Sequence, residues 1–387
     1  MAADLYSIQM DFPVGLMHDA WTDRAFAYAT GGVFPRLSWQ TTVRPHGGTR
    51  RGETPSHGYM HDEARFCWLL ELAPYNMGRR RVMRNLLLVT AGACVVNGGA
   101  ASTVEQLHLS FTGKHNSLGL DFVSKTSDSA KVIYGLAGND EVLEVGTDAV
   151  YHSEIGWLHA AELVNLSQTQ NYVYKVVEAD NASTPFYGFA SPPYEREGGV
   201  VAAVFADFGL RNDVSMGALR KDAEKGRVDY FLHSGDIAYD LMDNASEVGN
   251  EFMRVVSDSF AKNMPWMVNP GNHERKDNFT NYNVRFQGIS KHASVNSKSS
   301  DEDNIGGNFF YSFDVGLVHY VMINTEVYKY QSYVDQSEFP FSPKDQLDWL
   351  EVDLKKASDP DQRAKVPWIV MLGHKGWYAN PDDPPVP

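Results

Sequence analysis

The sequence predicts two consecutive domains, a small antiparallel β-sandwich followed by an α/β domain. Short apolar runs separated by turn residues fill residues 102–193, and several of them alternate apolar and polar side chains. Over residues 198–387 longer apolar runs alternate with helical patterns, which is typical of a buried sheet with helices on its faces. With 387 residues, of which 43% are hydrophobic, the chain is long enough to build both cores.

Five runs in the first region are predicted to be strands: EQLHLSFTG, SLGLDFVSK, AKVIYGLA, IGWLHAAELVNL and NYVYKVVEA. Clusters of Gly, Asn, Asp and Ser between them indicate tight turns, so we expect an antiparallel sandwich. The segment FASPPYEREGG that follows has the composition of a linker, because X-Pro steps favour extended chain.

The second region contains helical patterns in VSMGALRKDAEK and SPKDQLDWLEVDLKKA. In the latter, Ser342 is placed to cap a helix and Pro343 fits its first position. Leu347, Leu350 and Leu354 recur at helical spacing and predict its apolar face.

Five apolar runs of the second region end in acidic, amide or imidazole side chains: VVAAVFADFG, RVDYFLHSGD, MPWMVNPGNHE, VHYVMINTE and VPWIVMLGH. Ligands of open α/β sheets bind beyond the carboxyl ends of the strands, so these polar groups should gather at one site. Carboxylates there would repel one another and lose hydration, and metal ions remove both costs. Oxygen and nitrogen donors without thiolate suit hard or borderline cations, and a bridging Asp can hold two of them. The alternative is that these side chains end the strands in turns by bonding local backbone donors. For Asp207 taken alone, this role and metal binding are equally open.

The motifs at these strand ends resemble the successive signatures of the purple acid phosphatases, within the calcineurin-like metallophosphoesterase superfamily. They are ADFG with Asp207, GDIAY with Asp236 and Tyr239, GNHE with Asn272, His273 and Glu274, and PWIVMLGHKGWY with His374. GDxxY separates this family from other metallophosphoesterases, which lack the tyrosine. The resemblance spans residues 104–380 and implies an all-β fibronectin-type-III-like sandwich followed by an α/β (α+β sandwich) metallophosphoesterase domain.

The resemblance also implies a binuclear metal centre. Asp207 and Tyr239 would bind Fe(III), Asp236 would bridge the two metals, and Asn272 with His374 would bind a divalent ion, Zn, Mn or Fe(II). Charge transfer from the phenolate to iron would give a purple colour. The metals would then activate a hydroxide that attacks a phosphate monoester in line, which makes the expected activity that of an acid phosphatase.

Three other polar side chains in or beside the motifs are expected to assist the site without binding metal. His273 is the candidate for binding phosphate or protonating the leaving alcohol, with a structural contact beside the metal as the alternative. Glu274 is expected to orient its neighbours, and His233, on the strand that leads to Asp236, is expected to lie outside the ligand shell. His319 is expected to be a core histidine.

The chain departs from the family pattern at its end. The last signature, GHxH, should supply one histidine to each metal some distance after His374, but the chain stops at Pro387 and no other His-x-His occurs. We therefore expect a catalytic domain that is C-terminally incomplete, from a truncated chain or gene model, whose activity as given suffers from the two absent ligands.

The N-terminal part predicts no domain. Residues 1–76 show no sustained strand or helix period, and we expect an irregular extension that arises from the gene model or is poorly ordered. Residues 77–101 combine four arginines, an apolar stretch and small residues, which is the layout of a signal peptide. A short amphipathic or buried helix is the alternative. If this segment is a signal peptide, translation starts at Met77. The mature protein would then lie outside the cell or in a lysosome- or vacuole-like compartment.

Sequons for N-glycosylation point to the same compartment. They lie at Asn165, Asn181, Asn244 and Asn278. The two cysteines, Cys67 and Cys94, precede the proposed mature protein, so cysteine usage does not decide the redox compartment.

Composition limits the partners. A formal net charge of −15 argues against a nucleic-acid binder, and no apolar run is long enough for a membrane span. Small phosphate esters are the expected substrates, and a homodimer is compatible with the sequence. Two alternatives stay open: a phosphodiesterase or nucleotide pyrophosphatase of the same superfamily, and a non-catalytic secreted glycoprotein that keeps the fold without metal.

Overall fold

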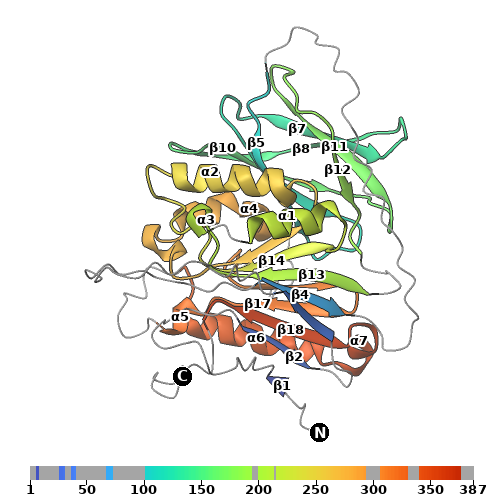
Figure 1. The fold of residues 1–387 in the computed structure, drawn as a ribbon, viewed down its shortest axis with the longest axis vertical. Coiled ribbons are helices and arrows are strands. Elements are labelled where there is room, and N and C mark those ends of the chain that lie inside the picture. Colours follow the sequence, from blue (N-terminus) through green and yellow to red (C-terminus); the bar gives the residue numbers. More distant parts are fainter. Residues whose placement is uncertain are drawn as a thin grey trace, which may run out of the picture.

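The computed structural model describes residues 101–193, 199–212, 215–292, 306–329 and 340–375, together with four short N-terminal strands whose backbone alone is described. Figure 1 shows a β-sandwich at the top and an α/β domain below it. Both predicted domains, and their order, are confirmed.

The sandwich consists of two four-stranded antiparallel sheets with the orders β5-β6-β10-β9 and β12-β11-β7-β8. Its strands are β5 (Glu105–Phe111), β6 (Leu118–Ser124), β7 (Ala130–Leu136), β8 (Leu143–Gly146), β9 (Asp148–His152), β10 (Gly156–Leu163), β11 (Asn171–Glu178) and β12 (Tyr187–Ala190). The five predicted strands are all present. The sequence did not predict β8, β9 and β12, which are edge strands; β8 and β9 are largely exposed and lack a buried apolar face.

The α/β domain contains two sheets. The first joins β15 (Trp266–Asn269), β14 (Tyr230–Ser234) and β13 (Val200–Phe205) in parallel, and the second joins β16 (Tyr311–Val315), β17 (Val318–Met322) and β18 (Trp368–Gly373). In the second sheet β16 pairs antiparallel with β17, and β17 pairs parallel with β18. The hydroxyl groups of Tyr230 and Tyr320 lie 2.7 Å apart and link the two sheets through their shared core.

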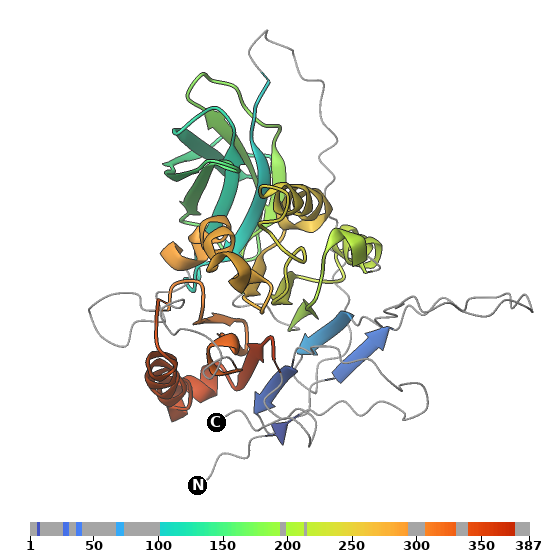
Figure 2. The same ribbon diagram turned by 90° about the vertical axis from the view of Figure 1, so that its left-hand side faces the viewer.

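Helices cover the outer sides of the two sheets. They are α1 (Met216–Glu224), α2 (Glu247–Val256), α3 (Thr280–Arg285), α4 (Gln287–His292), α5 (Glu326–Lys329), α6 (Pro343–Ala357) and α7 (Pro360–Lys365). Shorter turns of other helix types are η1 (Leu210–Asn212), η2 (Ser257–Ala261) and η3 (Glu274–Asp277). Figures 1 and 2 place α1 and α2 beside the first sheet and α6 beside the second. None of the helices that the structure describes has the length and apolar character to cross a membrane.

Helix α6 tests the helix prediction in detail. Ser342 accepts a hydrogen bond from the backbone N–H of Asp345 in a capping box, and Pro343 takes the first position, so the predicted start is confirmed. The predicted apolar face is wrong at Leu347, which is 48% exposed. The buried face instead runs through Trp349 and Leu350, because Trp349 packs on Phe310 with ring centroids 5.0 Å apart.

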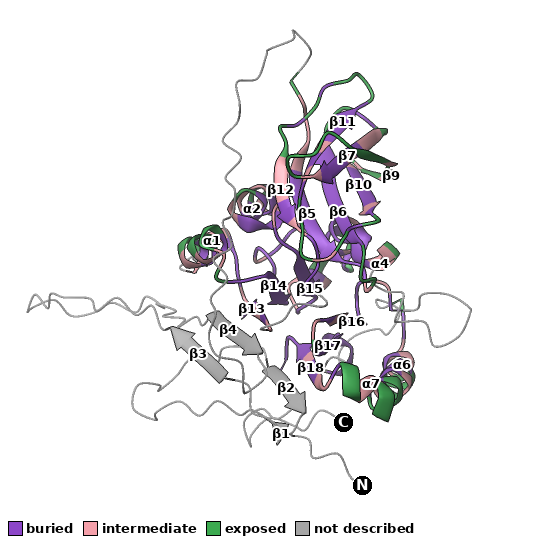
Figure 3. Ribbon diagram, turned by 90° about the vertical axis from the view of Figure 1, so that its right-hand side faces the viewer, coloured by how far each residue is buried: buried purple, intermediate pink, exposed green. Residues whose placement is uncertain are grey.

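The sandwich and the α/β domain share a continuous core. Leu109 of β5 forms a parallel bridge with Pro265, and the ring of Phe111 lies 5.2 Å from that of Tyr230. Figure 3 shows buried residues running from the sandwich sheets into β14 and β15. The sandwich is therefore packed against the α/β domain through residues of β5.

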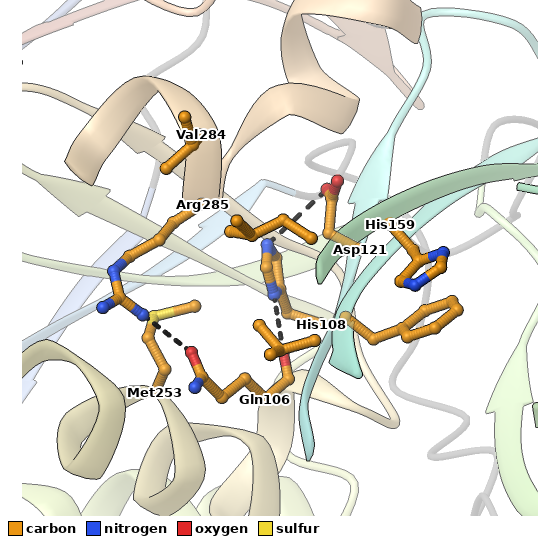
Figure 4. Close-up of a pocket in the computed structure, with 10 residues that line it drawn as sticks. Gln106, His108, Asp121, His159, Met253, Val284 and Arg285 are labelled. Carbon is orange, nitrogen blue, oxygen red and sulfur yellow. Dashed lines mark hydrogen bonds and ion pairs between the residues drawn. The ribbon is translucent and has the colours of Figure 1, made fainter. Parts of the chain in front are cut away.

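A small cavity lies in this interface (Figure 4). Its volume is about 10 Å³, and it is lined by Gln106, His108, Asp121, Phe122, Val123, Leu158, His159, Met253, Val284 and Arg285. Arg285 is only 2% exposed and donates to Gln106 Oε1 at 2.7 Å and to Asn250 Oδ1 at 2.9 Å. These hydrogen bonds connect β5 of the sandwich with α2 and α3 of the α/β domain.

Four strands lie within residues 1–76, so the prediction that this segment is irregular is wrong at these positions. They are β1 (Tyr6–Ser7), β2 (Phe26–Thr30), β3 (Arg36–Gln40) and β4 (Cys67–Leu72). β4 pairs antiparallel with β13, and β2 pairs antiparallel with β18. The edge of a sheet presents unpaired backbone groups that an extended segment can satisfy without a periodic sequence. The signal-like stretch up to Ala100, the linker at 194–198 and the chain end at 376–387 lie outside the described residues.

Candidate metal centre

Two neighbouring parallel strands deliver the first two carboxylates. Asp207 follows β13 and Asp236 follows β14, and the backbone N–H of Asp207 donates to Gly235 O at 3.1 Å. Both aspartates have left-handed backbone, with φ of 55° and 54°. Such backbone costs on the order of 1–3 kcal/mol per residue and is concentrated at functional sites. The two loops are thus held together in a strained arrangement that aims both carboxylates at one point.

His374 joins these carboxylates from the second sheet. It follows β18, is fully buried, and its Nε2 lies 3.3 Å from Asp236 Oδ1. Its Nδ1 lies 2.8 Å from Ser234 O, so Nδ1 carries the donated proton and Nε2 faces the site. One donor atom each from Asp207, Asp236 and His374 lie within 4.8 Å of one another.

Tyr239 and Asn272, the other two predicted ligands, contact Asp207 and His374. The Tyr239 hydroxyl donates to Asp207 Oδ1 at 2.9 Å. Asn272 Oδ1 lies 3.2 Å from His374 Nε2. Four of the five predicted ligands therefore contact one another in two pairs, Asp207 with Tyr239 and Asn272 with His374.

This donor set fits a pair of metal ions. It offers carboxylate, phenol, amide and imidazole atoms and no thiolate, a combination suited to hard and borderline cations. Burial opposes charge on both partners of the Asp236–His374 pair, yet their mutual attraction lowers the pKa of Asp236 to about 2 and raises the pKa of His374 to about 10. A bound cation would take the place of the His374 proton.

Two glycines make room for the predicted ligands because they have no side chain. A Cβ atom on Gly271 would lie 2.4 Å from Asp236 Oδ1, and one on Gly235 would lie 2.6 Å from the His374 ring. Gly235 also has φ of +80°. Gly235 opens GDIAY and Gly271 opens GNHE, but nothing in the spacing of these motifs signals their role in packing.

Glu274 fixes the loops that carry the ligands. It is 2% exposed, and its carboxylate accepts backbone N–H groups of Asp236 at 2.9 Å, Ile237 at 2.7 Å and Gly271 at 2.7 Å. Burial and the charge of Asp236 raise the pKa of Glu274 to about 8. This geometry supports the predicted orienting role.

His273 faces the same centre and has a partner that sequence analysis missed. Its Nε2 lies 3.6 Å from Asp236 Oδ2, and its Nδ1 lies 2.7 Å from Asp240 Oδ1. Asp240 also accepts from Lys276 Nζ, and the Tyr239 ring meets the His273 ring edge-on at 4.8 Å. Asp240 directly follows GDIAY, but nothing in its spacing signals a contact 33 residues along the chain.

Two further histidines of the α/β domain, His233 and His319, lie in the core. His233 is fully buried between Phe205 and Trp266, whose rings lie 4.7 and 5.9 Å from it, and neither ring nitrogen has a hydrogen-bond partner among the described residues. Burial lowers the pKa of His233 to about 3, so it acts as a neutral packing group. His319 bonds Asp314 and Asp353 at 2.6 and 2.8 Å, which confirms a satisfied core histidine.

The four sequon asparagines are surface residues. Asn165, Asn181, Asn244 and Asn278 are all exposed and have φ between 53° and 67°. Each therefore lies at an accessible turn, as attachment of a glycan requires.

The fold and the metal-type donor set at its strand ends define a calcineurin-like phosphoesterase, and that family model matches residues 202–385. The model for the N-terminal domain of purple acid phosphatases matches residues 104–191. The chain belongs to the purple acid phosphatase family.

Curated relatives match most of this chain. Acid phosphatase type 7 of Danio rerio is 32% identical over 294 residues, which cover 72% of this chain and 60% of the relative. Acid phosphatase type 7 of Homo sapiens is 32% identical over 308 residues, covering 77% and 64%. The chain thus spans about three fifths of the length of these relatives. The structure of the purple acid phosphatase PPD1 from yellow lupin (Lupinus luteus) seeds matches with a TM-score of 0.50 and 19% identity, covering 69% of this chain and 50% of that one.

Proposed function

We propose that the protein is an acid phosphatase that hydrolyses phosphate monoesters at a binuclear metal centre. The observation that carries the proposal is that donor atoms of Asp207, Asp236 and His374 lie within 4.8 Å of one another. The Tyr239 hydroxyl contacts Asp207, and Asn272 Oδ1 lies beside His374 Nε2. A bridging carboxylate with a distinct donor pair on each side suits two unlike cations. The family relationship supports the same activity.

The two sides differ in donor chemistry. A phenolate and a carboxylate favour a hard trivalent ion, so Asp207 and Tyr239 would hold Fe(III), whereas amide and imidazole donors would hold Zn, Mn or Fe(II). When bound, the metal pair supplies charge neutralisation for the phosphoryl oxygens and an activated water as nucleophile.

The protein's own groups orient the reactants. Glu274 holds the backbone of the ligand loops through three hydrogen bonds, and this fixes the direction of Asp236. Asp240 binds His273 Nδ1 and leaves Nε2 facing the centre. His273 Nε2 would then donate a proton to the leaving alcohol or a hydrogen bond to phosphate.

We also propose that the protein enters the secretory pathway. The support is the signal-like segment at 77–101 and the four exposed sequon asparagines. A glycosidase-dependent shift in electrophoretic mobility of the native protein would test it, and an unglycosylated protein retained in the cytosol would contradict it.

The decisive experiment measures metal content, visible absorption and hydrolysis of p-nitrophenyl phosphate for the full-length protein and two variants. We expect about two metals per chain and a visible charge-transfer band in the wild type. Asp236→Ala should lose the metal pair, and Tyr239→Phe should keep metal but lose the band. Tyr151→Phe, at a 58% exposed sandwich position, is the matched control and should keep the colour.

Three results would change the assignment. A band that persists in Tyr239→Phe would show that the phenolate is wrongly assigned. Faster cleavage of bis-p-nitrophenyl phosphate than of the monoester would favour the diesterase alternative. A wild-type protein without metal would favour the non-catalytic glycoprotein.

A further inference from the structure

A buried lysine lies beside the ligand Asn272. Lys375 follows His374 directly, is 6% exposed, and its Nζ lies 2.5 Å from Asn272 Oδ1. The same oxygen lies 3.2 Å from His374 Nε2. An ammonium group therefore sits on the inner side of the site, in contact with an atom of the proposed divalent metal site.

The backbone around Lys375 is held firmly. Its N–H donates to Thr325 Oγ1 at 2.8 Å, in the loop that follows β17, and Gly373 ends β18 two residues earlier. A Cβ on Gly373 would lie 2.6 Å from Thr325 Cγ2, so the two loops are in close contact. Lys375 is thus anchored by its backbone to the second sheet while its ammonium group reaches the GNHE loop of the first.

The ammonium contact with Asn272 is incompatible with a metal ion on the same lone pair. A divalent cation bound to an amide oxygen lies about 2.0–2.2 Å from it, closer than Nζ lies in this structure. Loading of the site would therefore shift Nζ away from Asn272, but the anchored backbone and the buried position keep it near the centre. The anion that this site would admit is the phosphoryl group of the substrate.

We propose that Lys375 binds a non-bridging oxygen of the phosphoryl group and so sets the affinity of the site for phosphate. This inference rests on the proposed function and adds a phosphate-binding residue of the protein to the metal pair. Charged hydrogen bonds of this kind are among the strongest that side chains make with phosphate.

The test compares Lys375→Met with Lys375→Arg and with the exposed-site control Lys355→Met, all in the full-length protein. Metal content is measured by elemental analysis, and inorganic phosphate is titrated calorimetrically and through the shift of the visible band. Lys375→Met should keep its metals and bind phosphate about tenfold more weakly or worse. Lys375→Arg should retain most of the affinity, and Lys355→Met, whose side chain is 72% exposed, should match the wild type.

Other outcomes would overturn the proposal. Unchanged phosphate affinity in a metal-loaded Lys375→Met protein would show that the ammonium group does not contact phosphate. Tighter divalent-metal binding with unchanged phosphate affinity would show that it merely fills the metal position, and loss of metal would show that it holds the ligand loop together. A wild-type protein that lacks metal and monoesterase activity would instead refute the proposed function itself.

Discussion

At the scale of single residues, Glu274 shows how a buried carboxylate serves the site without binding metal. Its two oxygens accept three backbone N–H groups from both ligand loops. In Glu274→Gln one oxygen becomes an NH₂ group that faces a backbone donor. We expect a loss of about 1–3 kcal/mol of unfolding free energy and weaker metal binding, measured by urea denaturation and metal titration. Glu144→Gln, at an exposed position of β8, should change neither; equal losses in the two variants would contradict the role of Glu274.

Gly271 sets a second test at the residue scale. A methyl group there would meet the carboxylate of Asp236 and, at 2.9 Å, the His374 ring. Gly271→Ala should therefore displace Asp236, the proposed bridging ligand, and reduce metal content well below two per chain, measured by elemental analysis. The control is Gly217→Ala in α1, where an added Cβ has no neighbour within 4 Å and helix propensity should improve. Full metal content in Gly271→Ala would show that the loop can move aside.

At the scale of elements, an ion-pair cluster joins the second sheet to its covering helix. His319 of β17 bonds Asp314 of β16 and Asp353 of α6, and Ser312 Oγ donates to Asp353 Oδ1 at 2.6 Å. Burial opposes the charge, but the hydrogen bonds to Asp314 and Asp353 raise the pKa of His319 to about 9. The histidine is therefore protonated in the folded protein over a range in which it is neutral when unfolded.

The sign of the resulting pH dependence follows from this raised pKa. The stabilisation is complete below the unfolded value near 6.5 and is lost as pH rises through about 9. It amounts to about 3 kcal/mol at most. His319→Gln should remove this decline from the unfolding free energy measured by denaturant at pH 6 to 10, whereas His115→Gln, at an exposed turn, should keep it. An unchanged decline in His319→Gln would place its origin elsewhere.

The sequence predicts strands and helices correctly where a buried face produces a regular spacing of apolar residues. The five strands predicted for the sandwich have buried faces, and Ser342 with Pro343 marks the start of α6 through local capping chemistry. Leu347 was assigned to the wrong face because helical spacing gives a period but not the direction of the partner surface. Helix α2 was missed although its Phe252 and Met253 are buried.

At the scale of the whole molecule, the sequence predicts that the proposed ligands gather, because each stands in a motif at the end of a strand, and donor atoms of Asp207, Asp236 and His374 do lie within 4.8 Å of one another. Asp240 and Lys375 were not predictable, because their roles depend on which loops meet: His273 lies 33 positions from Asp240, and Asn272 lies 103 positions from Lys375. The resemblance suggests the ligands, and only the folded chain shows the groups that contact these proposed ligands.

The domain interface carries the last prediction. Arg285 is buried among neutral acceptors and bonds Gln106 of β5, Asn250 of α2 and Asn281 of α3. Arg285→Met keeps most of the volume but leaves these buried polar groups without their donor, so we expect a loss of about 3 kcal/mol or more in unfolding free energy. Arg220→Met, whose replaced side chain is 61% exposed, should cost little.

Calorimetry separates a shared core from two docked domains. Because Leu109 and Phe111 of the sandwich also pack on the α/β domain, the Arg285→Met protein should still unfold in one transition, at a lower temperature than the wild type. Two separate transitions in the wild type would show that β5 does not couple the domains. Two transitions in Arg285→Met alone would mean that the polar network, rather than the apolar contacts, holds the sandwich to the metal-binding domain.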